Sequence, residues 1–139
     1  MKIFIYFVGK PKDSHLNGSA EEFVKRTSRF CPCEMREINP NRFDPFDKHP
    51  SGRKICLDPA GRQMDSWKFS EIFSEAEQVG RDLIFVIGGH DGLLPAWKKN
   101  ADLLLSLSPM TFPHEMARAM IAEQIYRAYT ILRGHPYPR

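Results

Sequence analysis

The chain has 139 residues, a net charge of +3 and 42% hydrophobic residues, the size of one domain (residues 1–139) and an ordinary composition for a globular protein. No apolar run approaches the roughly 18 residues that span a bilayer, which argues against a membrane protein. Cys31, Cys33 and Cys56 are an odd number without a second ligand pair, so we expect reduced thiols in the cytoplasm and no metal site.

The N-terminal part predicts a strand followed by a helix. Residues 2–9, KIFIYFVG, are a continuous apolar run, too short and without a cleavage site for a signal peptide, and they indicate a strand buried on both faces. Ser19 and Glu22 have the spacing of a capping box, so we expect a helix to begin at Ala20 and to end at Cys31.

The next segment predicts short strands around a long loop. A strand is expected over residues 34–39, and residues 39–53, with three prolines and no periodicity, are expected to form a bare loop. Residues 54–58, KICLD, return to a strand pattern. The turn-forming sequence Pro59-Ala60-Gly61 is expected to end that strand.

The second half of the chain alternates helices with apolar strands. Asp65 or Ser66 can cap a helix that ends at Gly80, and residues 83–87 form the next strand. A short helix over residues 96–100 leads to a strand over residues 103–107.

The last helix is expected to start near Pro113 and to end at Gly134. Its inward positions are expected to be Met116, Met120, Ile121, Ile125, Ala128 and Leu132. The alternation of strands and helices predicts an α/β domain with a mostly parallel sheet and helices on both faces.

The glycine turn GGHDG (residues 88–92) follows a buried strand, at the edge where open α/β sheets bind ligands. It lacks the spacing of a dinucleotide fingerprint or a P-loop, and a tight turn without a ligand explains it equally well. Two more strand ends, in CLDPAGR (residues 56–62) and SLSPMTFPHE (residues 106–115), also carry irregular turns. Together the three turns could enclose an adenine-bearing ligand, read mainly by backbone groups.

At MKIFIYFVGK, LIFVIGGHDGL and LSLSPMTFPHEMARAMIAEQIYRAYTILRGHPY the sequence resembles the RlmH family, small SPOUT-superfamily methyltransferases of large-subunit ribosomal RNA. The resemblance implies methyl transfer from S-adenosylmethionine to N3 of a pseudouridine in the assembled ribosome. It also implies a C-terminal trefoil knot, which the general rule against threaded chains would not predict. An antiparallel homodimer with active sites at its interface is implied as well.

The resemblance also implies the site residues. The cofactor pocket is expected to use Leu57, Gly88, Leu107, Ser108, Pro109, Met110, Thr111 and Phe112. The tail HPYPR is expected to lie over the active site and to touch RNA, so Tyr137, Arg139 and His114 are the candidates for catalytic roles. His114 is a possible proton acceptor, although it could simply hydrogen-bond its loop.

Two features depart from the family pattern. Pro138 stands where the family usually has a histidine, so any role of that histidine is absent or supplied by another group. Residues 39–53 replace what is normally a charged helix, which could change RNA affinity or the dimer surface.

The basic and aromatic residues of the last segment have two explanations. Arg118, Arg127 and Arg133 could neutralise phosphates or be the solvated arginines of an amphipathic helix. For Tyr126 and Tyr129 we favour packing over base stacking. For Tyr137 and Arg139, beyond the helix end, we favour function.

Two other functional classes stay open from the sequence. One is a non-catalytic RNA- or nucleotide-binding domain that retains the cofactor pocket. The other is a flavodoxin-like module, which would bind flavin and not S-adenosylmethionine. A methyl-transfer assay distinguishes the enzyme from both of these classes.

Overall fold

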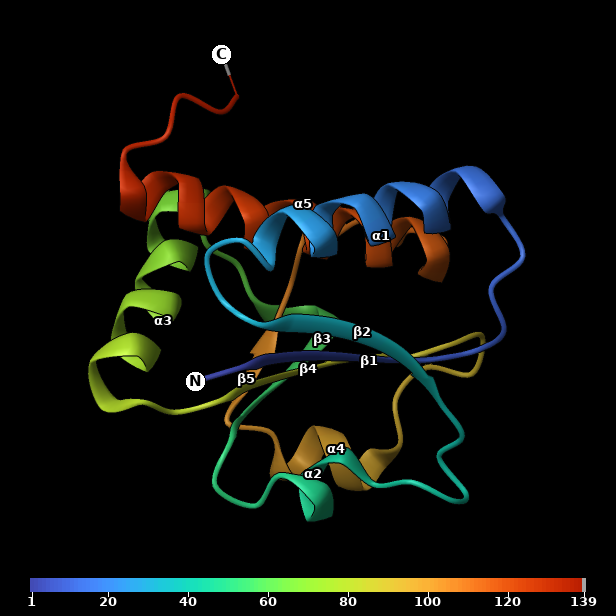
Figure 1. Ribbon diagram of the computed structural model, residues 1–139. Helices are drawn as coiled ribbons and strands as arrows, with labels where there is room; N and C mark the ends of the chain where they lie inside the picture. Colours follow the sequence, from blue (N-terminus) through green and yellow to red (C-terminus); the bar gives the residue numbers. More distant parts are fainter. Residues whose placement is uncertain (139) are drawn as a thin grey trace.

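The computed structural model describes residues 1–138 and contains a five-stranded parallel sheet with helices on both faces (Figure 1). The sheet order is β2-β1-β4-β3-β5. The strands are β1 (Ile3–Val8), β2 (Cys33–Ile38), β3 (Arg53–Arg62), β4 (Leu83–Ile87) and β5 (Leu103–Leu105). The helices are α1 (Ser14–Thr27), α2 (Pro45–Lys48), α3 (Ser66–Val79), α4 (Pro95–Asn100) and α5 (His114–Arg133).

The two faces of the sheet bury separate apolar clusters. Helices α1, α3 and α5 lie on one face, and α2 and α4 lie on the other (Figure 1). Ile5 and Phe85 point to the α3 and α5 side, whereas their strand neighbours Tyr6 and Ile84 point to the side of Trp97 in α4. This alternation is the period of a strand, so the predicted sheet covered on both faces is confirmed.

Helix α1 begins earlier than its sequence pattern predicts. Asp13 is the N-cap, and its carboxylate accepts hydrogen bonds from the N–H groups of His15 and Leu16, both at 3.0 Å. Ser19 lies inside the helix, so the predicted capping box with Glu22 is wrong. A carboxylate that satisfies two free N–H groups fixes the start of the helix instead.

Strand β3 does not end at Pro59-Ala60-Gly61 as predicted. It continues to Arg62, with a shift of register against β5 between Leu57 and Arg62. A Cβ atom added to Gly61 would lie 2.5 Å from the carbonyl oxygen of Leu104, so glycine allows the two strands to approach. Strand β5 ends at Leu105 and is shorter than the expected 103–107.

The segment 39–53 is less bare than predicted. Asp44 caps the short helix α2 through the N–H group of Phe46. Phe43 and Phe46 pack on the cluster around Tyr6 and Trp97. Isolated aromatic anchors of this kind have no period, which is why the sequence pattern did not reveal them.

Helix α5 buries an unexpected set of residues. Ile121, Ile125 and Ala128 are buried as predicted, and Met120 and Leu132 are half-buried. Met116 is exposed, so its predicted core position is wrong. Tyr126 and Tyr129 are buried, in agreement with a packing role. Arg118, expected in solvent, is fully buried.

Within residues 1–138, no helix is both long and apolar enough to cross a membrane. Cys31, Cys33 and Cys56 are free thiols. The same residues contain no cluster of three or more histidine, cysteine or acidic side chains that could hold a metal ion.

Candidate functional site

A pocket of about 280 Å³ lies at the edge of the sheet where the strands end. Its walls are the middle of β3 (Leu57, Asp58 and Pro59), the turn after β4, the loop after β5, Lys98 of α4 and the start of α5. The carboxyl ends of parallel strands meet at one edge, and ligands of open α/β sheets bind there. The three irregular turns singled out in the sequence therefore line one pocket.

Most of the residues expected to hold the cofactor line this pocket. They are Leu57, Gly88, Leu107, Ser108, Met110 and Phe112. Pro109 and Thr111 belong to the same loop and are exposed, but they do not line the pocket. His114 lines it from the first residue of α5. Arg139 lies outside the described residues.

The glycine turn approaches the protein's own backbone. A Cβ atom on Gly88 would lie 2.6 Å from the carbonyl carbon of Gly92, and one on Gly89 would lie 2.7 Å from the carbonyl oxygen of Val8. Gly92 has a φ of +78°, which favours glycine for conformational reasons. The turn thus folds tightly against itself and against β1, and this close packing forms one wall of the pocket.

The loop after β5 is held by serine hydroxyls. Ser106 Oγ is within hydrogen-bond distance of the carbonyl oxygens of Pro59 (3.0 Å) and Ser108 (2.9 Å). Ser108 Oγ accepts from the N–H group of Met110 at 3.0 Å. The contact with Pro59 ties the loop to β3, while Met110 remains 73% exposed at the pocket.

An ion pair at the pocket was not found from the sequence. Lys98 of α4 lies 2.8 Å from a carboxylate oxygen of Asp58, and both residues line the pocket. The hydrogen bond from Lys98, helped by one from the N–H group of Ala60, lowers the pKa of Asp58. Asp58 follows an apolar strand, and that position could have revealed it; Lys98 had no comparable signal.

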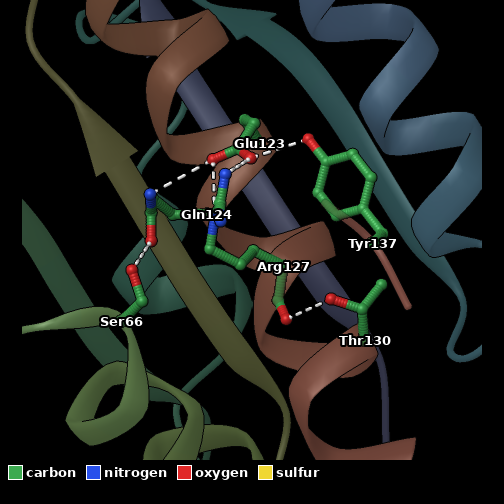
Figure 2. Close-up of polar contacts among 6 residues, drawn as sticks. All are labelled: Ser66, Glu123, Gln124, Arg127, Thr130 and Tyr137. Carbon is green, nitrogen blue, oxygen red and sulfur yellow. Dashed lines mark hydrogen bonds and ion pairs between the residues drawn. The ribbon is translucent and has the colours of Figure 1, made fainter. Parts of the chain in front are cut away.

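Tyr137, in the tail after α5, packs back against that helix and does not line the pocket. Its hydroxyl donates to Glu123 at 2.7 Å, and Glu123 is also paired with Arg127 (Figure 2). The ring packs on Tyr126, with centroids 4.8 Å apart. Burial and the carboxylate of Glu123 raise the pKa of Tyr137 to about 12, so the hydroxyl is a neutral donor.

Figure 2 also shows how the contact between Tyr137 and Glu123 is connected to α3. Gln124 contacts Glu123 at 3.1 Å and Ser66 at 2.7 Å, which links α5 to the start of α3. Glu123 follows His114 by nine residues on the same helix. At 1.5 Å per residue, the two are separated by about 14 Å along the axis. One chain therefore does not bring Tyr137 and His114 into a common site.

Comparison with known proteins assigns the family. A family model described as "Predicted SPOUT methyltransferase" matches residues 1–138. A protein of Solibacter usitatus named "Ribosomal RNA large subunit methyltransferase H" is 63% identical over 139 residues, covering 100% of both chains. The chain belongs to the RlmH family of SPOUT methyltransferases. The resemblance inferred from the sequence is thereby confirmed.

Solved structures agree with the SPOUT fold of this RlmH-family chain. A probable methylase family protein from Haemophilus influenzae has a TM-score of 0.65 at 11% identity, covering 99% of this chain and 70% of its own. The SpoU methyltransferase AviRb from Streptomyces viridochromogenes, solved in complex with the cofactor AdoMet, has a TM-score of 0.55 at 13% identity, covering 91% and 57%. At such identities the likeness concerns the fold alone. The trefoil knot stays a prediction.

Proposed function

We propose that this RlmH-family chain transfers a methyl group from S-adenosylmethionine to N3 of a pseudouridine. The target lies in the large-subunit ribosomal RNA of the assembled ribosome. The chain would act as a single domain, in the cytoplasm. The observation that carries the proposal is the pocket at the carboxyl edge of the sheet, built from three irregular turns. The family, and the name of the relative from Solibacter usitatus, support the reaction and the RNA class.

The pocket has the chemistry that this cofactor needs. Leu57, Leu107 and Phe112 provide apolar surfaces for an adenine ring and a thioether chain. The Asp58–Lys98 pair offers both charges to polar groups. Its volume of about 280 Å³ lies near the lower end of small-molecule pockets, roughly 300–1,000 Å³. The AdoMet-bound SpoU methyltransferase of similar fold supports the same choice.

The protein's own part in the reaction is positioning and control of one proton. Bound S-adenosylmethionine supplies a methyl group on a positively charged sulfonium, and N3 of the base loses its proton as it accepts that group. Alignment of the two reactants can remove roughly 7–11 kcal/mol of the barrier. His114 lines the pocket and is the candidate to accept the proton or to hydrogen-bond the base. Tyr137, with its raised pKa, is suited to hold the tail and not to act as a base.

The proposal includes an antiparallel homodimer. Its support is the separation of His114 and Tyr137 along α5, since the tail of a second copy could supply what one chain does not bring together. A second hollow of about 650 Å³, lined by half-buried Met120 and exposed Met116 among others, offers an apolar surface for that contact. Sedimentation is expected to give a dimer; a stable monomer of 16.1 kDa would contradict the shared site.

The deciding experiment is methyl transfer from labelled S-adenosylmethionine to unmodified assembled ribosomes, separated subunits and naked ribosomal RNA. Label in one pseudouridine of assembled ribosomes is the expected result, and it would also show that Pro138 is tolerated. Cofactor binding without any transfer would refute the enzyme and favour a non-catalytic binding domain.

A further inference from the structure

Two buried charged side chains on α5 have no part in the pocket described above. Arg118 is 0% exposed and Glu115 is 7% exposed. Burying a charge is costly unless hydrogen bonds compensate it. Apart from one bond between Glu115 and Asn17 of α1, their hydrogen bonds go to Val8 at the end of β1 and to the segment Gly9–Asp13, which we call the β1–α1 connection.

Arg118 fixes the beginning of the connection. Its Nη2 atom donates to the carbonyl oxygens of Val8 at 3.0 Å and Gly9 at 2.9 Å. Its guanidinium lies over the ring of Phe7, 4.0 Å from the centroid. Gly9 has a φ of +105°, a conformation that favours glycine. The chain is therefore bent at a defined point directly after β1.

Glu115 fixes the end of the connection. One carboxylate oxygen accepts from the N–H group of Lys12 at 2.9 Å, and the other accepts from that of Asp13 at 2.7 Å. The side-chain amide of Asn17 adds a third bond at 3.1 Å. These hydrogen bonds lower the pKa of Glu115, so its charge is retained at neutral pH. The backbone of the connection is thus held at both ends by the same helix.

The connection lies beside the pocket. A Cβ atom added to Gly9 would lie 3.8 Å from His114 Nε2 and 3.9 Å from the Cα atom of Gly89, and both of these residues line the pocket. In Figure 1 the connection is the dark-blue segment that rises from the end of β1 to α1, at the edge where the glycine turn also lies.

The connection presents positive charge that its own acidic groups do not neutralise. Lys10 and Lys12 are exposed, and among the described residues neither takes part in an ion pair. The carboxylate of Asp13 is engaged as the cap of α1, and that of Glu115 is buried. Two lysines therefore stand on a rigid backbone next to the site where the base must enter.

We infer that the β1–α1 connection is a pre-formed contact for the RNA backbone, in which Lys10 and Lys12 bind phosphates near the target nucleotide and Arg118 and Glu115 are positioning residues. The inference rests on the proposed function, because it takes ribosomal RNA as the partner. A segment that is ordered before binding loses little conformational freedom on binding, which favours affinity. Lysines that neutralise phosphates also make the affinity dependent on salt.

The test measures binding of the full-length protein to assembled ribosomes at several salt concentrations, with S-adenosylhomocysteine in place of the methyl donor. The variants are Lys10→Ala, Lys12→Ala and the charge-preserving Lys10→Arg and Lys12→Arg. Lys48→Ala is the matched control. Lys48 is also exposed, but it lies shortly before the start of β3, toward the edge of the sheet opposite the pocket.

Each alanine variant is expected to bind several-fold more weakly at low salt, with a salt slope reduced by about one. The arginine variants and Lys48→Ala are expected to keep the slope of the unaltered protein, and all variants to keep its cofactor affinity and melting temperature. An unchanged slope in Lys10→Ala and Lys12→Ala would overturn the inference. Weaker binding to ribosomes with an unchanged slope would indicate a ribosomal protein as the partner, and would overturn it too.

Arg118→Lys tests the positioning role separately. It keeps a buried cation, but the lysine side chain is shorter and lacks the planar guanidinium, so its ammonium does not reach the position from which Nη2 donates to both carbonyl oxygens. Affinity for ribosomes is expected to fall while the salt slope stays, because the lysines remain; unchanged affinity would refute positioning. Since no methyl is transferred in these measurements, failure of the proposed reaction would be seen separately, in the assay with labelled methyl donor.

Discussion

Gly88→Ala is the sharpest test of how the pocket wall is built. The added methyl group would lie 2.6 Å from the carbonyl carbon of Gly92, 2.9 Å from its oxygen and 2.9 Å from the nitrogen of Leu93, where ordinary contacts begin at 3.4 Å. All three atoms belong to the backbone, so no side chain can rotate away. The turn must move by a large part of an ångström.

The size of the effect follows from this geometry. Overpacking of this kind costs about 1–3 kcal/mol, which for a chain of this length lowers the melting temperature by roughly 4–12 °C. Because Gly88 lines the pocket, the displaced turn is expected to weaken S-adenosylmethionine binding at least about tenfold, equivalent to about 1.4 kcal/mol. Gly88→Val adds more bulk at the same point and is expected to lose more.

The assay combines thermal unfolding with calorimetric titration of the cofactor, and Gly18→Ala is the matched control. Gly18 lies within α1, and nothing lies within 4 Å of an added Cβ atom. This variant is expected to gain about 0.5–1 kcal/mol from helix propensity and to bind the cofactor normally. If Gly88→Ala melts and binds like the unaltered protein, the argument from backbone contact is wrong.

Three further predictions concern the tail and the thiols. In a double-mutant cycle, Glu123→Gln and Tyr137→Phe are expected to couple by about 0.5–3 kcal/mol of unfolding free energy, and simple additivity would contradict the hydrogen bond between them. The pKa of Tyr137, raised from 10.0 to about 12, means that its contribution to stability is complete below pH 10 and is lost as the pH rises toward 12. Tyr137→Phe should remove that pH dependence from denaturant titrations, and an equal dependence in both proteins would count against it. Burial raises the pKa of Cys56 to about 12, so we expect negligible alkylation of Cys56 at pH 8 in the folded protein; rapid labelling would disagree with its burial.

The sequence predicted the parts of the fold that follow from a simple physical pattern. Strands β1 and β4 are continuous apolar runs because both faces of a parallel sheet are buried, so their bounds could be read within a residue or two. Gly80 and Gly134 end α3 and α5 in the left-handed conformation expected of glycine.

The features that the sequence did not predict depend on partners distant along the chain. The burial of Arg118 depends on the carbonyl groups of Val8 and Gly9, 110 and 109 residues away, and no local pattern encodes them. The position of Tyr137 depends on Glu123, 14 residues earlier, and no periodic pattern marks that pair. For the site, the irregular turns in CLDPAGR and SLSPMTFPHE could be seen in the sequence, and the family resemblance assigned their individual residues to the cofactor. Asp58 and Lys98 needed the fold to bring them together.

Helix α5 carries His114, which lines the pocket, and Glu123, which anchors Tyr137 of the tail. The spacing of these two residues limits how relatives can differ in length. Inserting one residue between His114 and Glu123 would move the tail anchor by about 1.5 Å and turn it by about 100° relative to the pocket. Residues 39–53 cover the other face of the sheet through Phe43 and Phe46, and none of them lines the pocket. Insertions and deletions among relatives should therefore fall in that segment and be absent from this helix, as the equal length of the Solibacter usitatus relative permits.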